Sequence, residues 1–199
     1  MQRSIAVGVG IMEFPFDTTA GFWRWVDLCE AGGIDSIWQT DRLISRVPIL
    51  ESMSALAAIA GRTRRIKFGV NVVSVAMREP VLLAKQCATI DMLSGGRVNW
   101  GAGRGFARVE FDAFGVPPEE STSRFREAVE IVLRAWCDER VSFAGTHFRF
   151  DAVEVLPKPV QQPHPPVGMA ATSESEIDWA AGRGFSILMD PHASFKELA

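Results

Sequence analysis

The sequence predicts an α/β fold built on a parallel sheet, in a single domain that spans residues 1–199. Two observations predict it. Short runs rich in β-branched and aromatic residues alternate along the chain with longer segments of helical periodicity. Polar and glycine-rich segments follow the short runs, as expected for loops at one edge of a parallel sheet. A chain of 199 residues is also long enough to bury a substantial core.

Six strands and one hairpin are expected. The hairpin combines residues 141–143 and 148–150, which a short turn separates. Because repeated strand–helix units join parallel strands, we expect helices to cover the outside of the sheet. Doubly wound sheets and (β/α)8 barrels both fit this pattern. The six strands are expected at residues 5–9, 36–38, 66–73, 98–101, 167–170 and 187–189.

The first two helices are expected at residues 18–31 and 50–60. In the first, Phe22, Val26 and Cys29 share one face, and a pair of glycines ends the helix. The second is rich in alanine.

Three later helices have clear boundaries. Pro80 begins one, at a position where a missing N–H costs nothing, and Gly95 ends it. Residues 121–138 have the clearest amphipathic spacing. Ser173 caps the last helix, and Glu176 three residues later completes a capping box.

Polar residues gather where the expected strands end. Both candidate folds bind ligands beyond the carboxyl ends of their strands. We therefore expect a ligand site there, formed by Asp41, Arg42, Asn71, Ser74, Arg104, Thr172 and Ser173.

The glycine-rich segment 101–105 contains Arg104 and predicts a phosphate site, because glycines let the backbone approach a ligand and arginine pairs with phosphate. It is not a nicotinamide fingerprint, since Phe106 replaces the last glycine and a loop is expected to follow. Thr172 and Ser173 offer a second phosphate position at a helix N-terminus, although Glu176 would compete there.

The composition argues against several classes of protein and of site. A net charge of -3 argues against a nucleic-acid partner, and neither a membrane span nor a secretory signal is expected. The three cysteines are interpreted as buried free thiols of a cytoplasmic protein. The three histidines are scattered, so no metal site is expected, and His147 is expected to be solvated.

Several segments in order resemble the bacterial luciferase-like monooxygenase family of flavin-dependent (β/α)8 enzymes. They span nearly the whole chain, and each is weak alone while the ordered set is specific. The segments are residues 33–38, 65–69, 80–86, 93–97, 103–105, 111–115, 156–159, 162–166 and 179–184.

The resemblance implies roles for single residues. Arg104 matches the arginine that binds the flavin phosphate, and Ser173 and Glu176 match helix-start positions that help to hold it. Asn71 and Val72 fall where the family often has a non-prolyl cis peptide bond beneath the flavin ring.

The resemblance also implies the reaction and the partners. With FMN, reduced flavin from a partner reductase would activate oxygen for a small organic substrate. With a deazaflavin, the reaction would be hydride transfer. A non-catalytic flavin-binding protein is the alternative from another class. A homodimer is expected, through the apolar faces of helices at residues 50–60 and 81–93.

Two departures from the family pattern stand out. The luciferases have a catalytic histidine after the second strand, where this chain has Asp41 and Arg42. These two are the catalytic candidates, as a local ion pair or as an Arg42 that binds an acidic substrate or the cofactor. The second departure is length, since a (β/α)8 barrel typically needs about 250 residues. We therefore expect a barrel truncated after about six strand–helix units, which an expressed fragment, a truncated gene product or a reduced fold that dimerises would explain.

Overall fold

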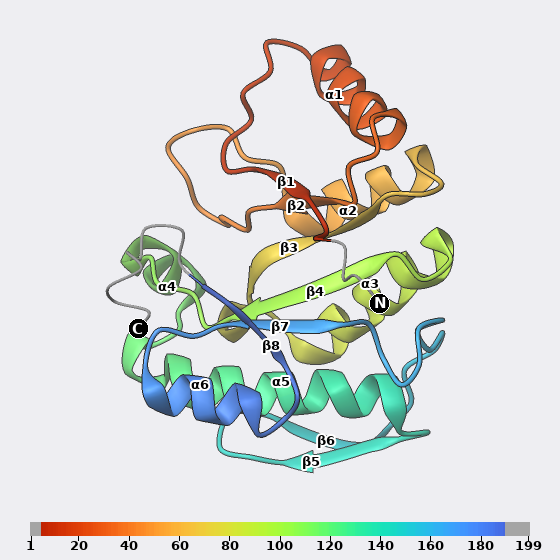
Figure 1. Cartoon of the computed structure of the whole chain (residues 1–199). Helices are drawn as coiled ribbons and strands as arrows, with labels where there is room; N and C mark the ends of the chain where they lie inside the picture. Colours follow the sequence, from red (N-terminus) through yellow and green to blue (C-terminus); the bar gives the residue numbers. More distant parts are fainter. Residues whose placement is uncertain (1–4, 190–199) are drawn as a thin grey trace.

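The computed structural model describes residues 5–189 and shows a six-stranded sheet in which all neighbouring strands are parallel (Figure 1). The strands lie in the order β1-β2-β3-β4-β7-β8. They are β1 (Gly8–Ile11), β2 (Ser36–Gln39), β3 (Lys67–Ser74), β4 (Val98–Gly103), β7 (Val167–Ala170) and β8 (Ser186–Leu188).

This order decides between the two predicted architectures. A doubly wound sheet reverses its strand order partway, whereas here each strand lies beside the previous sheet strand in the chain. The sheet curls as part of a (β/α)8 barrel wall, which confirms the predicted fold class and its extent of six strands.

The helices cover the outside of this wall, with α2, α3 and α5 packed in series (Figure 1). A separate antiparallel hairpin of β5 (Val141–Ala144) and β6 (Arg149–Val153) packs against α5. The α-helices are α1 (Thr19–Ala31), α2 (Ser52–Arg62), α3 (Pro80–Ser94), α4 (Arg108–Phe114), α5 (Ser121–Cys137) and α6 (Glu174–Ala181), and the 3-10 helices are η1 (Val75–Met77) and η2 (Pro118–Glu120).

The local signals in the sequence act as expected in the helices. Phe22, Val26 and Cys29 form the buried face of α1. In α3 the side chain of Glu79 accepts a hydrogen bond at the N-terminus, and Gly95 ends the helix in the left-handed region at φ 67°.

Trp100, a buried side chain of the core, joins the sheet to the helical layer. Its ring meets that of Trp136 on α5 edge-to-face at 5.1 Å between centroids. The Trp136 indole N–H donates to the carbonyl of Ala84 on α3 at 3.0 Å. The core therefore fixes α3 and α5 on β4, the strand that leads into the glycine-rich segment.

One strand boundary was predicted wrongly, and one helix was not predicted. The first strand begins at Gly8, not at residue 5, because its pairing with β2 starts opposite Ser36 and the residues before it are exposed. A loop follows Gly105 directly, as expected, but α4, which begins at Arg108, was not predicted. This helix has only seven residues and no side-chain cap, so its periodic signal is weak, yet it buries Glu110.

Two predictions about solvent exposure were also wrong. Cys137 is exposed, because it is the last residue of α5, whereas Cys29 and Cys87 are buried. The His147 side chain is only 7% exposed, because it packs against α5 with a nitrogen 2.8 Å from the Ser123 hydroxyl.

Candidate functional site

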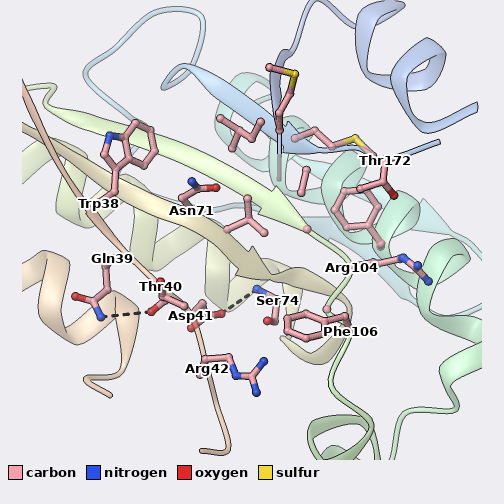
Figure 2. Close-up of a pocket in the computed structure, with 18 of the residues that line it drawn as sticks. Trp38, Gln39, Thr40, Asp41, Arg42, Asn71, Ser74, Arg104, Phe106 and Thr172 are labelled. Atoms are coloured by element: carbon pink, nitrogen blue, oxygen red, sulfur yellow. Dashed lines mark hydrogen bonds between the residues drawn. The ribbon is translucent and has the colours of Figure 1, made fainter. Parts of the chain in front are cut away.

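A cavity of about 570 Å³ opens at the carboxyl ends of the parallel strands (Figure 2). Seven of the eight predicted cofactor and catalytic residues line it, which fits the expectation for this fold class. Ser173 is the eighth; it lies next to the wall as the N-cap of α6. The seven are Asp41, Arg42, Asn71, Val72, Arg104, Thr172 and Glu176.

The glycines around Arg104 are required by the geometry of the β4 end. A side chain at Gly103 would collide with Val72 across the strands. Gly105 has a φ of 85°, and a Cβ there would collide with Met77. The tight loop leaves the Arg104 side chain half exposed at the cavity.

Arg104 is held loosely. Its Nε lies 3.8 Å from Glu176 Oε1, and its Nη1 lies 3.5 Å from the Ser121 hydroxyl. A second cation, Arg126 on α5, also lines the cavity, with its guanidinium over the Trp179 ring. Two guanidinium groups thus mark the α5–α6 end of the cavity.

Glu176 occupies the N-terminus of its own helix. Its Oε2 accepts from the backbone N–H groups of Thr172 at 3.0 Å and Ser173 at 3.2 Å, the glutamate half of the predicted capping box. Burial raises the pKa of Glu176, but these backbone hydrogen bonds and Arg104 outweigh it and hold the pKa below its ordinary value. An anionic ligand at this helix end would meet a carboxylate as well as Arg104.

The floor of the cavity includes the peptide bond between Asn71 and Val72, which is cis, as the resemblance implies. The pairing of β3 with β4 shifts its register between Val70 and Val73. Figure 2 shows the Asn71 side chain between Trp38 and the centre of the cavity.

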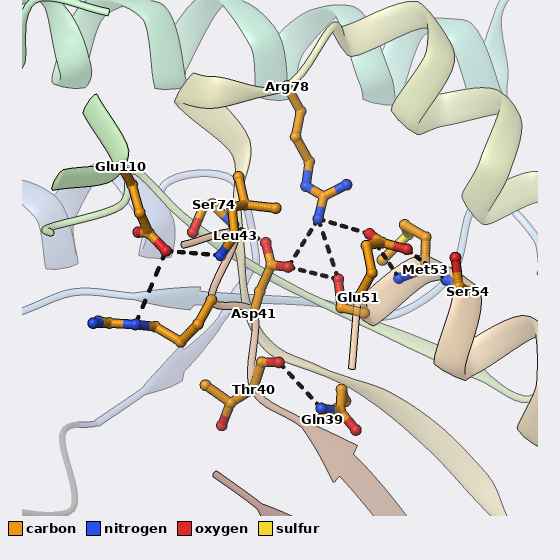
Figure 3. A network of polar contacts seen from close by, with 12 residues as sticks. Gln39, Thr40, Asp41, Leu43, Glu51, Met53, Ser54, Ser74, Arg78 and Glu110 are labelled. Atoms are coloured by element: carbon orange, nitrogen blue, oxygen red, sulfur yellow. Dashed lines mark hydrogen bonds and ion pairs between the residues drawn. The ribbon is translucent and has the colours of Figure 1, made fainter. Parts of the chain in front are cut away.

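Asp41 follows β2 and anchors three segments of the chain (Figure 3). Its Oδ1 accepts from the Ser52 hydroxyl at 2.7 Å and from Arg78 Nη2 at 2.8 Å. Its Oδ2 accepts from the Ser74 backbone N–H at 2.8 Å. Both carboxylate oxygens are therefore engaged, and Arg78 also donates to Glu51 at 3.0 Å.

Arg42 does not pair with its neighbour Asp41, contrary to the local ion pair considered from the sequence. Its Nε instead faces Glu110 Oε1 at 3.9 Å, and its guanidinium carbon lies 4.8 Å from the centre of the Phe106 ring. Glu110 is 1% exposed and also accepts from the Leu43 backbone N–H at 2.7 Å.

The sequence did not single out several residues of this site. Glu110 and Arg78 act on partners more than 35 positions away, which no local pattern reveals. Arg126 was not considered, although one turn of α5 reaches the cavity. Phe106 was noted only as a mismatch to a glycine motif.

Other kinds of site find no support in residues 5–189. No group of three or more histidine, cysteine or acidic side chains is placed to hold a metal ion. No helix within that range is long and apolar enough to cross a membrane.

Relatives of this chain include a flavin-dependent monooxygenase and a reductase. It is 32% identical over 134 residues to the FMNH(2)-dependent dimethylsulfone monooxygenase of Pseudomonas putida, covering 66% of this chain and 37% of the relative. It is 32% identical over 166 residues to the 5,10-methylenetetrahydromethanopterin reductase of Archaeoglobus fulgidus, covering 83% and 48%. The crystal structure of monooxygenase RslO1 from Streptomyces bottropensis matches with a TM-score of 0.89 and 29% identity, covering 97% and 62%.

The chain spans less than half the length of these two curated relatives. The chain also shares its fold, with a TM-score of 0.77 and 22% identity, with a coenzyme F420-dependent tetrahydromethanopterin reductase from Methanopyrus kandleri, covering 94% of this chain and 56% of that one. Coenzyme F420 is a deazaflavin. The family model for luciferase-like monooxygenases matches residues 7–199. With the parallel barrel wall and the cavity at its carboxyl edge, this match shows that the chain belongs to the luciferase-like monooxygenase family.

Proposed function

We propose that this chain binds FMN in the cavity and belongs to a monooxygenase that oxidises a small organic substrate with reduced flavin and oxygen. The observation that carries the proposal is the cavity itself: one space joins an apolar interior, the Asn71–Val72 peptide bond and the Arg104–Arg126 end. Its volume of about 570 Å³ lies in the range of small-molecule and cofactor sites.

The residues present fit a flavin phosphate at the α5–α6 end. Arg104 and Arg126 supply positive charge, and the hydroxyls of Thr122 and Thr172 line the same cavity. Glu176 disfavours a phosphate there, because its carboxylate already faces Arg104 and accepts hydrogen bonds from backbone N–H groups at the start of the helix. We infer that Arg104 binds the phosphate with its terminal nitrogens while Glu176 limits the affinity.

Bound there, the flavin supplies either oxygen activation or hydride transfer, and the chain supplies binding and orientation. Apolar side chains such as Ile11, Phe125 and Met169 line the interior and exclude water from it. Asp41 fixes the β2 and β3 ends and has no free oxygen for proton transfer, so we assign it to positioning. We assign Ser173 to positioning the N-terminus of α6, since its side chain does not line the cavity.

The phosphate assignment is tested with FMN and riboflavin, which differ only in the phosphate. Replacing Arg104 with Gln removes one charged donor, and we expect FMN to bind about 10- to 100-fold more weakly. Riboflavin binding is expected to change little. Glu176→Gln is expected to strengthen FMN binding severalfold, because it removes the competing charge.

Arg108→Gln is the matched control, since Arg108 is an exposed arginine that pairs with Asp112 on α4. Fluorescence titrations with FMN and with riboflavin measure the dissociation constants of the wild type and the three variants. Equal losses of FMN and riboflavin affinity in Arg104→Gln would contradict a phosphate contact, and no flavin binding by the wild-type chain would refute the proposed function.

A deazaflavin-dependent reductase is the second candidate, because the chain is similar to a reductase over 83% of its length. A flavin-binding protein without turnover is the third. Anaerobic reduction followed by oxygen separates them: oxygen-dependent substrate turnover supports the monooxygenase, and hydride exchange with a reduced deazaflavin supports the reductase. Tight binding without either reaction supports the third.

We propose further that the chain acts in the cytoplasm as a homodimer, supplied with reduced flavin by a reductase. The exposed apolar side chains Leu82, Met92 and Leu93 on α3 support a contact through the α2–α3 face. Light scattering on the purified chain tests the dimer, and a monomer at micromolar concentration would contradict it.

A further inference from the structure

Arg42 follows β2 and lines the cavity beside Phe106, and its guanidinium is held from one side only. Its Nε lies 3.9 Å from Glu110 Oε1. Its guanidinium carbon lies 4.8 Å from the centre of the Phe106 ring, which Figure 2 shows beside it. Among residues 5–189 no group accepts a hydrogen bond from its terminal nitrogens. The Arg42 side chain is 29% exposed and lines the cavity.

The carboxylates near Arg42 are not available to satisfy these nitrogens. Asp41 is bound to Arg78, Ser52 and Ser74. Glu110 is buried behind the loop, and its Oε1 already accepts from the backbone N–H groups of Leu43 and Ile44. Glu110 therefore orients Arg42 through its Nε, and the two terminal nitrogens of Arg42 remain available to a ligand.

Phe106 supplies apolar surface beside Arg42. Phe106 is 79% exposed although it lies in the cavity wall, so a bound molecule would cover aromatic surface there. An arginine that lies over an aromatic ring and has free terminal nitrogens suits an anion with two or more acceptor oxygens, such as a carboxylate or sulfonate, which it can bind through two parallel hydrogen bonds.

The charge of the cavity wall agrees with this assignment. Three arginines line the wall, at positions 42, 104 and 126, and the two acidic residues among the lining side chains are Asp41 and Glu176. Asp41 is neutralised by Arg78, and Glu176 by Arg104 and backbone N–H groups. If Arg104 and Arg126 hold the cofactor phosphate, Arg42 keeps a charge that the cofactor does not use.

We propose that the Arg42–Phe106 part of the cavity binds the carboxylate or sulfonate of an organic substrate whose body is apolar. That the bound anion is a substrate rests on the proposed function. The binding of the anion by Arg42 stands on the contacts above and is measured without turnover.

The test uses benzoate and octanoate as probes, each compared with its neutral amide. Calorimetric titrations are run on the chain alone and on the chain saturated with FMN, and FMN binding is measured separately. We expect each acid to bind about 10- to 100-fold more tightly than its amide. Arg42→Gln is expected to abolish this preference, Arg42→Lys to retain part of it, and the exposed control Arg108→Gln to leave it unchanged.

The outcomes separate the inference from the proposed function. Equal binding of acid and amide by the wild-type chain would overturn the anion site, as would an undiminished preference in Arg42→Gln. If Arg42→Gln weakens FMN binding as much as Arg104→Gln does, Arg42 belongs to the cofactor and the inference is wrong. Failure of the wild type to bind flavin, with the acid preference intact, would refute the proposed function alone. Melting temperatures check folding, and Arg42→Lys keeps the test decisive if Arg42→Gln does not fold.

Discussion

Replacing Asp41 with Asn should lower the melting temperature sharply, because the carboxylate accepts three hydrogen bonds in a buried place. An amide has one acceptor oxygen, so in either orientation its NH2 faces a donor. In one orientation the NH2 group of the new amide faces the Ser74 backbone N–H, and in the other it faces the Ser52 hydroxyl and the Arg78 guanidinium. Arg78 keeps Glu51 as a partner at 3.0 Å. Leaving a buried donor unsatisfied costs about 1–3 kcal/mol, and breaking a buried pair costs about 3–5 kcal/mol.

We therefore expect Asp41→Asn to cost about 3 kcal/mol, at the point where these two ranges meet. For a chain of this size that corresponds to a fall of roughly 6–12 °C in melting temperature. Thermal unfolding followed by circular dichroism measures it.

The matched control is Asp27→Asn, which makes the same chemical change in a bidentate pair with Arg62. Both partners of that pair are about half exposed, so no resolvable shift is expected. A melting temperature for Asp41→Asn within error of the wild type would refute the argument that Asp41 anchors the strand ends.

Three further predictions follow from other parts of the structure. Burial raises the pKa of Glu127, but the backbone N–H groups of residues 146–148 outweigh it and hold the pKa below its ordinary value. Its stabilisation is therefore complete above the ordinary pKa and is lost as pH falls through the folded-state pKa, so Glu127→Gln should remove part of the acid sensitivity seen in melting curves from pH 7 to 3. In thiol titration of the native chain, Cys137 should react while Cys29 and Cys87 stay protected, since burial raises the pKa of Cys87 to about 12; three reactive thiols without denaturant would contradict the burial. Gly105→Ala should lower the free energy of unfolding more than Gly115→Ala. Both substitutions cost about 1–2 kcal/mol because the backbone has positive φ, but only a Cβ at position 105 also contacts Met77. Equal denaturation midpoints for the two variants would show that the Met77 contact costs nothing.

The parts of the fold that sequence reasoning predicted well are those governed by local patterns. The buried face of α1 follows from side chains at helical spacing, and the end of α3 follows from a glycine that can adopt positive φ. The site was located because the carboxyl ends of parallel strands meet at one edge, so polar residues after separate strands could be expected together.

What the sequence could not reveal are contacts between distant segments. Glu110 is 67 positions from the backbone N–H that it binds, and it sits in a helix too short to give a periodic signal. The neighbours Asp41 and Arg42 look like a pair in the sequence, yet each has another partner. Sequence proximity misled there because the two side chains leave the β2 end toward different segments of the fold.

The distances of the arginine–carboxylate contacts distinguish supporting arginines from those available to a ligand. Arg78 lies 2.8 Å from the buried Asp41 carboxylate, so a ligand would have to break that contact to reach it. Arg42 and Arg104 instead lie 3.9 Å and 3.8 Å from Glu110 and Glu176, and both line the cavity. A contact at this distance sets the direction of a guanidinium without satisfying its terminal donors. Both looser contacts are made through Nε. Of the terminal nitrogens, only Arg104 Nη1 has a partner within residues 5–189, the Ser121 hydroxyl at 3.5 Å. Each arginine can therefore turn its terminal donors to an anion, and for this reason we assign one to the cofactor phosphate and the other to the substrate.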